Sequence, residues 1–149
     1  MRDTITAALQ AATKARDVRR VATLRMVSAA IKDRDIAART AGKDQASDAE
    51  LLELFAKMIK QREESQKIFA DAGRAELAQQ EGEEVDIIRE FLPKQLSDAD
   101  MAKAIDAAIA ETGAAGMKDM GKVMAALKSR YAGQMDFGKA SAAVKAKLS

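Results

Sequence analysis

The stretch that decides the fold runs from Ser47 to Pro93 and reads SDAELLELFAKMIKQREESQKIFADAGRAELAQQEGEEVDIIREFLP. Ser47 with Glu50 three residues later is a capping-box signature, so a helix is predicted to begin directly after Ser47. Apolar residues then recur at helical spacing, at Leu51, Leu54, Phe55, Met58, Ile59 and Phe69. Gly73 stands where a left-handed C-terminal cap belongs, and a further helix is predicted over 75–92, ended by Pro93. This stretch therefore predicts two antiparallel helices joined by a tight turn.

The composition agrees with a helical fold. The chain of 149 residues is rich in Ala, Leu, Lys, Arg and Glu, which are strong helix formers, and contains one Pro. Aromatic residues make up only 3% of it, which leaves little from which to build a sheet. The predicted fold class is all-α.

Two more helices are predicted before Ser47, over residues 1–16 and 18–39. The predicted caps are Asp3 or Thr4 for the first helix and Asp17 for the second. The apolar face of the second is predicted to hold Val18, Val21, Leu24, Val27 and Ile31, with Ile36 as a further candidate. Residues 1–96 are thus predicted to form an N-terminal domain of about four helices.

Three shorter helices are predicted after Pro93, over 98–112, 117–131 and 137–148. Their caps include Ser97, Gly113 and Asp136. The methionines at 117, 120 and 124 fall on one helix face and are interpreted as core residues. Residues 97–149 are therefore predicted to form a small three-helix domain, which needs contact with the first domain or with a partner to be stable.

Missing residue types exclude most catalytic chemistry. With no His and no Cys, the chain has no histidine general base, no thiolate nucleophile and no zinc-finger ligand set. Carboxylates on the fourth predicted helix are a candidate divalent-cation site, but they are more typical of a solvated face: Glu81, Glu83, Glu84, Asp86 and Glu90. No apolar run approaches the ~20 residues of a membrane span, and no leader pattern opens the chain. We expect a cytoplasmic protein with no metal, cofactor or membrane.

The formal net charge of +2 conceals an uneven distribution. Residues 1–46 carry +5, residues 47–96 carry −5 and residues 97–149 carry +2. Arg25, Lys32 and Arg39 are seven residues apart and are predicted to form one stripe along the second helix. Such a stripe suits a phosphate backbone, although basic residues beside an apolar face are more often simply solvated. A second basic cluster is predicted in the last two helices, at Lys118, Lys122, Lys128, Arg130 and Lys139.

Three stretches carry more information than the composition does: KQREESQKIFADAGRAELAQQEGEEVDIIREFLPKQL (60–96), DMGKVMAAL (119–127) and DFGKASAAVKAKL (136–148). In this order and spacing they resemble the GatB/YqeY family. LRMVSAAIKDRDI (24–36) also looks like the second helix of this family, so the resemblance covers nearly the whole chain. Members are small proteins similar to the C-terminal tail of the B subunit of the glutamyl/aspartyl-tRNA amidotransferase.

Two motif residues add to the candidate nucleic-acid-binding set. Arg74, in the AGR turn, is placed near the carbonyl end of the preceding helix, where a cation is favoured. Gly121, in MGKVM, lets a nucleic-acid backbone come close beside the charge of Lys122. Tight packing against another helix of the chain is an equally good reason for a glycine at 121.

The resemblance implies an accessory role in tRNA biology rather than catalysis. The tail of the amidotransferase B subunit reaches the outer corner of tRNA, while a separate domain of that subunit transfers ammonia. Carbon–nitrogen ligase activity with glutamine as amido-N-donor would thus be a family label, because this chain lacks the groups for it. We expect a non-catalytic tRNA-binding or tRNA-associated module that reads shape and backbone. The alternative is a protein-interaction adaptor with no nucleic-acid role.

Overall fold

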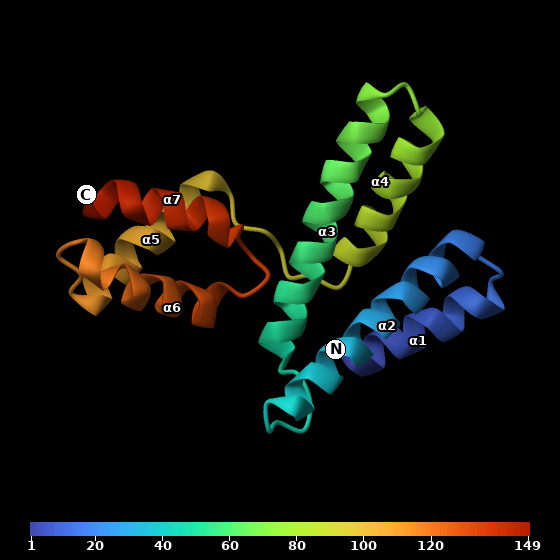
Figure 1. Cartoon of the computed structure of the whole chain (residues 1–149), viewed down its shortest axis with the longest axis horizontal. Helices are drawn as coiled ribbons and strands as arrows, with labels where there is room; N and C mark the ends of the chain where they lie inside the picture. Colours follow the sequence, from blue (N-terminus) through green and yellow to red (C-terminus); the bar gives the residue numbers. More distant parts are fainter. The chain divides into compact units, whose positions relative to one another are not determined.

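The computed structural model describes residues 1–149 and is all helical, with seven α-helices, one short 3₁₀ helix and no strand. The predicted all-α class is confirmed. The chain divides into two compact units, Met1–Leu92 and Pro93–Ser149, and each is described by itself (Figure 1).

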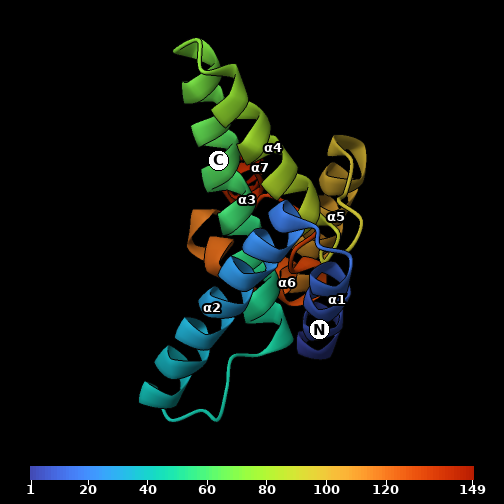
Figure 2. The ribbon, with the colours of Figure 1, turned by 90° about the vertical axis from the view of Figure 1, so that its right-hand side faces the viewer.

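The first unit consists of two helical hairpins. The first hairpin is formed by α1 (Arg2–Lys14) and α2 (Val18–Thr40), and the second by α3 (Asp48–Asp71) and α4 (Ala75–Arg89). Figures 1 and 2 show that α2 lies between α1 and the second hairpin, and α2 packs on α3 and α4 as well as on α1. The core that joins the hairpins includes Val27, Ile31, Leu51, Phe55, Met58, Ile59, Val85 and Ile88.

Capping side chains start the helices where the sequence predicts. Asp17 accepts a hydrogen bond from the Arg20 amide at 3.2 Å, and α2 begins at the next residue. Ser47 and Glu50 form the predicted capping box at the start of α3. Gly73 takes φ +74°, and the turn after α3 is closed by hydrogen bonds from the Gly73 amide to the Ala70 carbonyl and from the Arg74 amide to the Phe69 carbonyl. Local side-chain chemistry therefore sets the ends of the second hairpin.

Two predicted helix ends are wrong. Neither Asp3 nor Thr4 caps α1, because the helix already begins at Arg2 and Met1 occupies the cap position with no side-chain hydrogen bond. The last predicted turn of α4 is also absent, since the helix ends at Arg89 rather than Leu92. Pro93 has no N–H to donate to the carbonyl four residues earlier, so it cannot continue the helix. The Leu92 amide instead donates to the Arg89 carbonyl, three residues earlier, which is the hydrogen bond of a 3₁₀ turn.

The predicted apolar face of α2 is too wide. Leu24, Val27 and Ile31 are buried, whereas the side chains of Val18 and Ile36 are 80% and 58% exposed. At 100° per residue, Val18 and Ile36 both lie about 120° around the axis from Leu24, outside the arc that faces the core. The apolar repeat of three and four residues runs to both ends of α2, but only its members near the centre of the helix are buried. The repeat therefore predicts more buried residues than the structure contains.

Gly82 marks a close contact between α3 and α4. A Cβ atom at this position would lie 2.8 Å from the Gln66 side-chain nitrogen. The helix itself is continuous through Gly82. The close approach of α3, rather than a break in α4, therefore accounts for a glycine at this position.

The second unit is a three-helix bundle. It consists of α5 (Asp98–Thr112), α6 (Met120–Tyr131) and α7 (Phe137–Leu148), with the 3₁₀ helix η1 (Met117–Asp119) before α6. Its core contains Ala104, Ile105, Ala108, Val123, Leu127, Met135, Ala140 and Val144. Met120 and Met124 pack against this core, but Met117 is 43% exposed, so the prediction that it is a core residue is wrong. Met117 lies on the 3₁₀ turn, where the helical phase used to group the three methionines does not apply.

Arg16 holds the turn between α1 and α2 in an unfavourable conformation. Its φ is +57°, in the left-handed region that the other four positive-φ positions of this chain fill with glycine. For a residue with a Cβ this conformation costs about 1 kcal/mol. We therefore expect Arg16→Gly to raise the free energy of unfolding of the first unit by about 0.5–1 kcal/mol in urea titrations. Arg16→Ala keeps the Cβ, and an equal gain in that variant would show that charge, rather than φ, is responsible.

Candidate nucleic-acid interface

Arg25, Lys32 and Arg39 lie on one exposed side of α2, as the spacing predicts. Seven residues correspond to about 10.5 Å along a helix axis, so the three cations span about 21 Å. None of the three is in an ion pair, and Arg39 makes one hydrogen bond, from Nε to the Asp44 carbonyl at 3.2 Å. We call these three residues the α2 stripe.

The other cations of α2 have carboxylate partners. Arg19 pairs with Glu83 at 3.2 Å and Arg20 with Glu90 at 2.5 Å, so both hold α2 against α4. Arg34 lies 3.8 Å from Glu50, at the start of α3. The cations of α2 are therefore divided between ion pairs with α3 or α4 and the α2 stripe.

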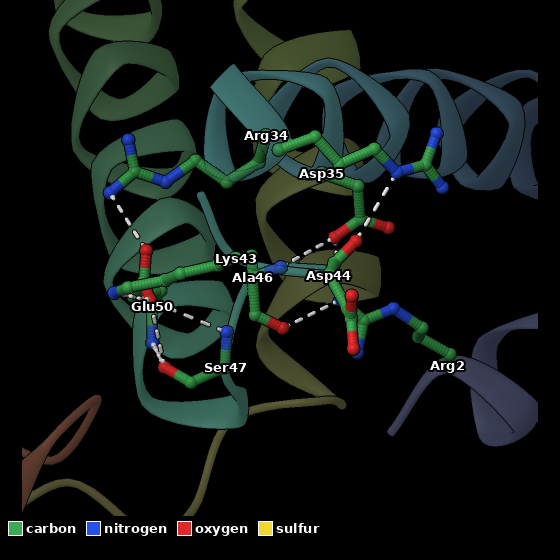
Figure 3. A network of polar contacts seen from close by, with 9 residues as sticks. Arg2, Arg34, Asp35, Lys43, Asp44, Ala46, Ser47 and Glu50 are labelled. Atoms are coloured by element: carbon green, nitrogen blue, oxygen red, sulfur yellow. Dashed lines mark hydrogen bonds and ion pairs between the residues drawn. The ribbon is translucent and has the colours of Figure 1, made fainter. Parts of the chain in front are cut away.

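A polar network fixes the loop after α2, beside Arg39 (Figure 3). The Arg2 guanidinium donates to Asp35 and to the Ala46 carbonyl, both at 2.7 Å, and the Ala46 amide donates to Asp35 at 2.9 Å. The hydrogen bond from Arg2 and the one from Ala46 hold the pKa of Asp35 below its ordinary value of 3.8. Asp35 therefore stays ionised and ties the loop to both α1 and α2.

Glu50 completes this network on the side of α3. It accepts hydrogen bonds from Lys43 Nζ at 3.2 Å and from the Ser47 amide at 3.4 Å, which lower its pKa. Lys43 and Arg34 both face this carboxylate, as Figure 3 shows. These two cations are engaged in holding the loop and do not extend the α2 stripe.

Three carboxylates of the candidate cation site pair with arginines: Glu83, Glu84 and Glu90. Glu84 pairs with Arg62 at 3.2 Å, with both side chains about 85% buried (14% and 15% exposed). Glu83 and Glu90 pair with α2, as described above. Burial and the nearby Glu84 raise the pKa of Glu81. These contacts give the acidic helix a structural role in joining α2, α3 and α4.

Arg74 lies on the turn between α3 and α4 and is exposed, without an ion pair. Its backbone amide donates to the Phe69 carbonyl at 2.8 Å, which places it next to the carbonyl end of α3 as predicted. The α2–α3 loop lies at the opposite end of α3, a helix of 24 residues, so Arg74 is about 36 Å away from it. The structure thus does not bring Arg74 together with the Arg39 end of the α2 stripe.

The predicted basic residues of the second unit are all exposed. Lys118 lies in η1, Lys128 in the last turn of α6 and Lys139 in the first turn of α7, and none of them is in an ion pair. Lys122 lies 3.9 Å from Asp119, with its own side chain 71% exposed. The Ala115 amide, followed by the charge of Lys122, lowers the pKa of Asp119. Arg130 of the predicted cluster pairs with Glu111, and the neighbouring Lys147 pairs with Asp106.

Gly121 faces open space. No atom of the chain lies within 4 Å of the position that a Cβ would occupy there. The alternative that Gly121 permits tight packing of another helix of this chain is therefore wrong. The glycine leaves an exposed backbone in the first turn of α6, next to Lys122.

Sequence reasoning missed the surface at the turn between α1 and α2. Exposed apolar side chains there lie next to cations that have no carboxylate partner, Lys14 and Arg16. The sequence could have indicated this surface, because helical periodicity places Val18 on a different side of α2 from Leu24 and Val27.

The model of the Yqey-like protein family matches residues 2–148. The chain belongs to the YqeY family. The match covers both units of this YqeY-family chain and confirms the resemblance drawn from its motifs. A search of curated proteins found no match. None of its helices combines the length and the apolar character that a membrane crossing requires.

Proposed function

We propose that this YqeY-family protein is a non-catalytic module that binds tRNA through the backbone of the nucleic acid. The observation that carries the proposal is the α2 stripe, because it stays free of ion pairs while other cations of α2 are neutralised by α3 and α4. Each phosphate that a Lys or Arg neutralises releases condensed counterions, which favours binding at low salt.

The second unit supports the proposal with an independent set of cations. Lys118, Lys128 and Lys139 are exposed and unpaired, and the open backbone at Gly121 leaves room for close approach of a phosphate. A loop or helix start with free amides suits an anion. The similarity of the sequence to the tail of the amidotransferase B subunit points to tRNA among structured RNAs.

The proposal assigns no chemical step to this chain. Without His or Cys, it has neither a histidine general base nor a cysteine nucleophile. A carbon–nitrogen ligase label with glutamine as amido-N-donor would belong to the larger amidotransferase, whose catalytic parts are separate. The RNA-binding role is therefore one of positioning or association.

The test is a titration of the full chain with total tRNA at several salt concentrations. The triple variant Arg25→Gln, Lys32→Gln, Arg39→Gln removes three charges from the α2 stripe. The control Lys57→Gln, Lys60→Gln, Lys67→Gln removes three exposed, unpaired charges from α3. We expect the stripe variant to bind about 10- to 100-fold more weakly near 0.1 M salt and its salt slope to fall by about 2–3.

The control variant should change affinity by less than about threefold, since its lysines lie outside the stripe. Equal losses in both triple variants would contradict the proposal, because binding would then follow net charge alone. Absence of tRNA binding by the wild-type chain would favour the adaptor alternative.

A further inference from the structure

The surface between α1 and α2 is hollowed near their connecting turn. One hollow of about 620 Å³ is lined in part by Leu9, Thr13 and Arg25, and a second of about 270 Å³ in part by Val18 and Arg25. Thr13 and Arg25 line both hollows, so the two form one continuous depression. We call it the α1–α2 groove.

The apolar side chains that line the groove come from both helices. Leu9 contributes from α1, and Val18, Val21 and Ala22 contribute from α2. Val18 is 80% exposed, the highest value among the large apolar residues that the protein leaves open to solvent. Apolar side chains gathered at an open groove favour a partner that removes them from water.

The charged side chains that line the groove, which we call its basic rim, are all cations. Lys14, Arg16 and Arg25 line it, none of them is in an ion pair, and no Asp or Glu is among the lining residues. The partner that complements this rim carries negative charge on both sides of an apolar strip. Electrostatic complementarity of this kind selects partners and accelerates their association.

We propose that the α1–α2 groove binds an amphipathic helix of a partner protein, with an apolar face bordered by Asp and Glu. A depression between two packed helices accepts the side-chain ridge of a third helix. The part of α2 that lines the groove, from Val18 to Arg25, covers about two turns, so apolar anchors at i, i+3 or i+4, and i+7 match its length.

This site is independent of the proposed RNA-binding role, although Arg25 borders both surfaces. Val18 carries no charge and lies at the edge of the α2 stripe, so its substitution distinguishes the two. Loss of helix binding in a Val18 variant that still binds tRNA would separate one site from the other.

The experiment uses the full chain and a designed 18-residue peptide with Leu on one face and Glu on both flanks. A second peptide carries Lys in place of every Glu. Binding is measured by fluorescence anisotropy and located by methyl NMR. We expect the Glu peptide to bind at least tenfold more tightly than the Lys peptide and to shift the methyl signals of Leu9, Val18 and Val21.

Two variants test the groove directly. Val18→Ser and Lys14→Glu should each weaken binding of the Glu peptide about tenfold, and the effect of Lys14→Glu should shrink at high salt. Ile68→Ser is the matched control, because Ile68 is 66% exposed but lies on α3. This control should bind the peptide as the wild type does.

Four results would overturn the proposal. They are equal affinity for both peptides, an equal loss in the Ile68→Ser control, self-association of the chain that Val18→Ser abolishes, and groove methyl shifts produced by tRNA instead of the peptide. The third would identify a second copy of the chain as the occupant, and the fourth would identify RNA.

Discussion

Replacing Phe55 by Ala is expected to lower the free energy of unfolding of the first unit by about 3–5 kcal/mol. The Phe55 side chain is fully buried and belongs to the core that joins α2, α3 and α4. The substitution removes a large apolar volume and leaves a cavity that the surrounding helices fill only in part.

The measurement is urea unfolding followed by circular dichroism, with Ile68→Ala as the control on the same helix. Ile68 is 66% exposed, so its truncation should change stability by less than about 0.5 kcal/mol. A loss below about 1.5 kcal/mol for Phe55→Ala would contradict the core described above.

Replacing Leu127 by Ala is expected to unfold much of the second unit while the first stays folded. Leu127 is fully buried in the core of α5, α6 and α7, and its truncation costs about 2–5 kcal/mol. A unit of this size has about 3–8 kcal/mol of stability in total, by the usual value per residue. The loss is therefore of the same order as the whole stability of Pro93–Ser149.

Methyl NMR of the full chain reads both units at once. Signals of Val123 and Val144 should lose dispersion in Leu127→Ala, whereas those of Val27 and Ile88 should keep their wild-type positions. Met117→Ala, at a 43% exposed residue, is the control and should leave both sets unchanged. Parallel loss of both sets would show that the two units unfold as one cooperative body, and would contradict the predicted two-domain organisation.

The ends of most helices could be predicted because their causes are local. A serine or aspartate cap bonds amides two or three residues away, and a glycine such as Gly73 supplies a backbone conformation that few other residues adopt. Arg16 was not foreseen as a left-handed residue, since no local signal in its side chain predicts that conformation.

The buried face of α2 could be predicted only at its centre. Leu24, Val27 and Ile31 face the core as the periodicity indicates. Val18 and Ile36 are also apolar, but both are exposed, because they lie outside the part of α2 that packs on α3 and α4. Hydropathy indicates that an apolar side chain favours burial. Which side of a helix is buried depends on where the other helices pack against it.

The α2 stripe shows the same division between local and tertiary information. Seven-residue spacing alone places Arg25, Lys32 and Arg39 on one side of a helix. The same sequence contains Arg19 and Arg20 on the same helix, and nothing in its spacing tells which cations stay free. The fold decides this, because α4 brings Glu83 and Glu90 against those two arginines.

The sequence by itself determined an all-α chain of seven helices, most of their caps, the YqeY resemblance and the alternation of basic and acidic segments behind a net charge of +2. Helix propensity, caps and periodicity depend on residues that are close together in the sequence, so the sequence alone is enough to predict them. Only the tertiary structure decided which charges cancel, which cations remain unpaired and where an apolar groove stays open. These depend on contacts between residues such as Arg20 and Glu90, which are 70 positions apart in the chain and adjacent in the fold.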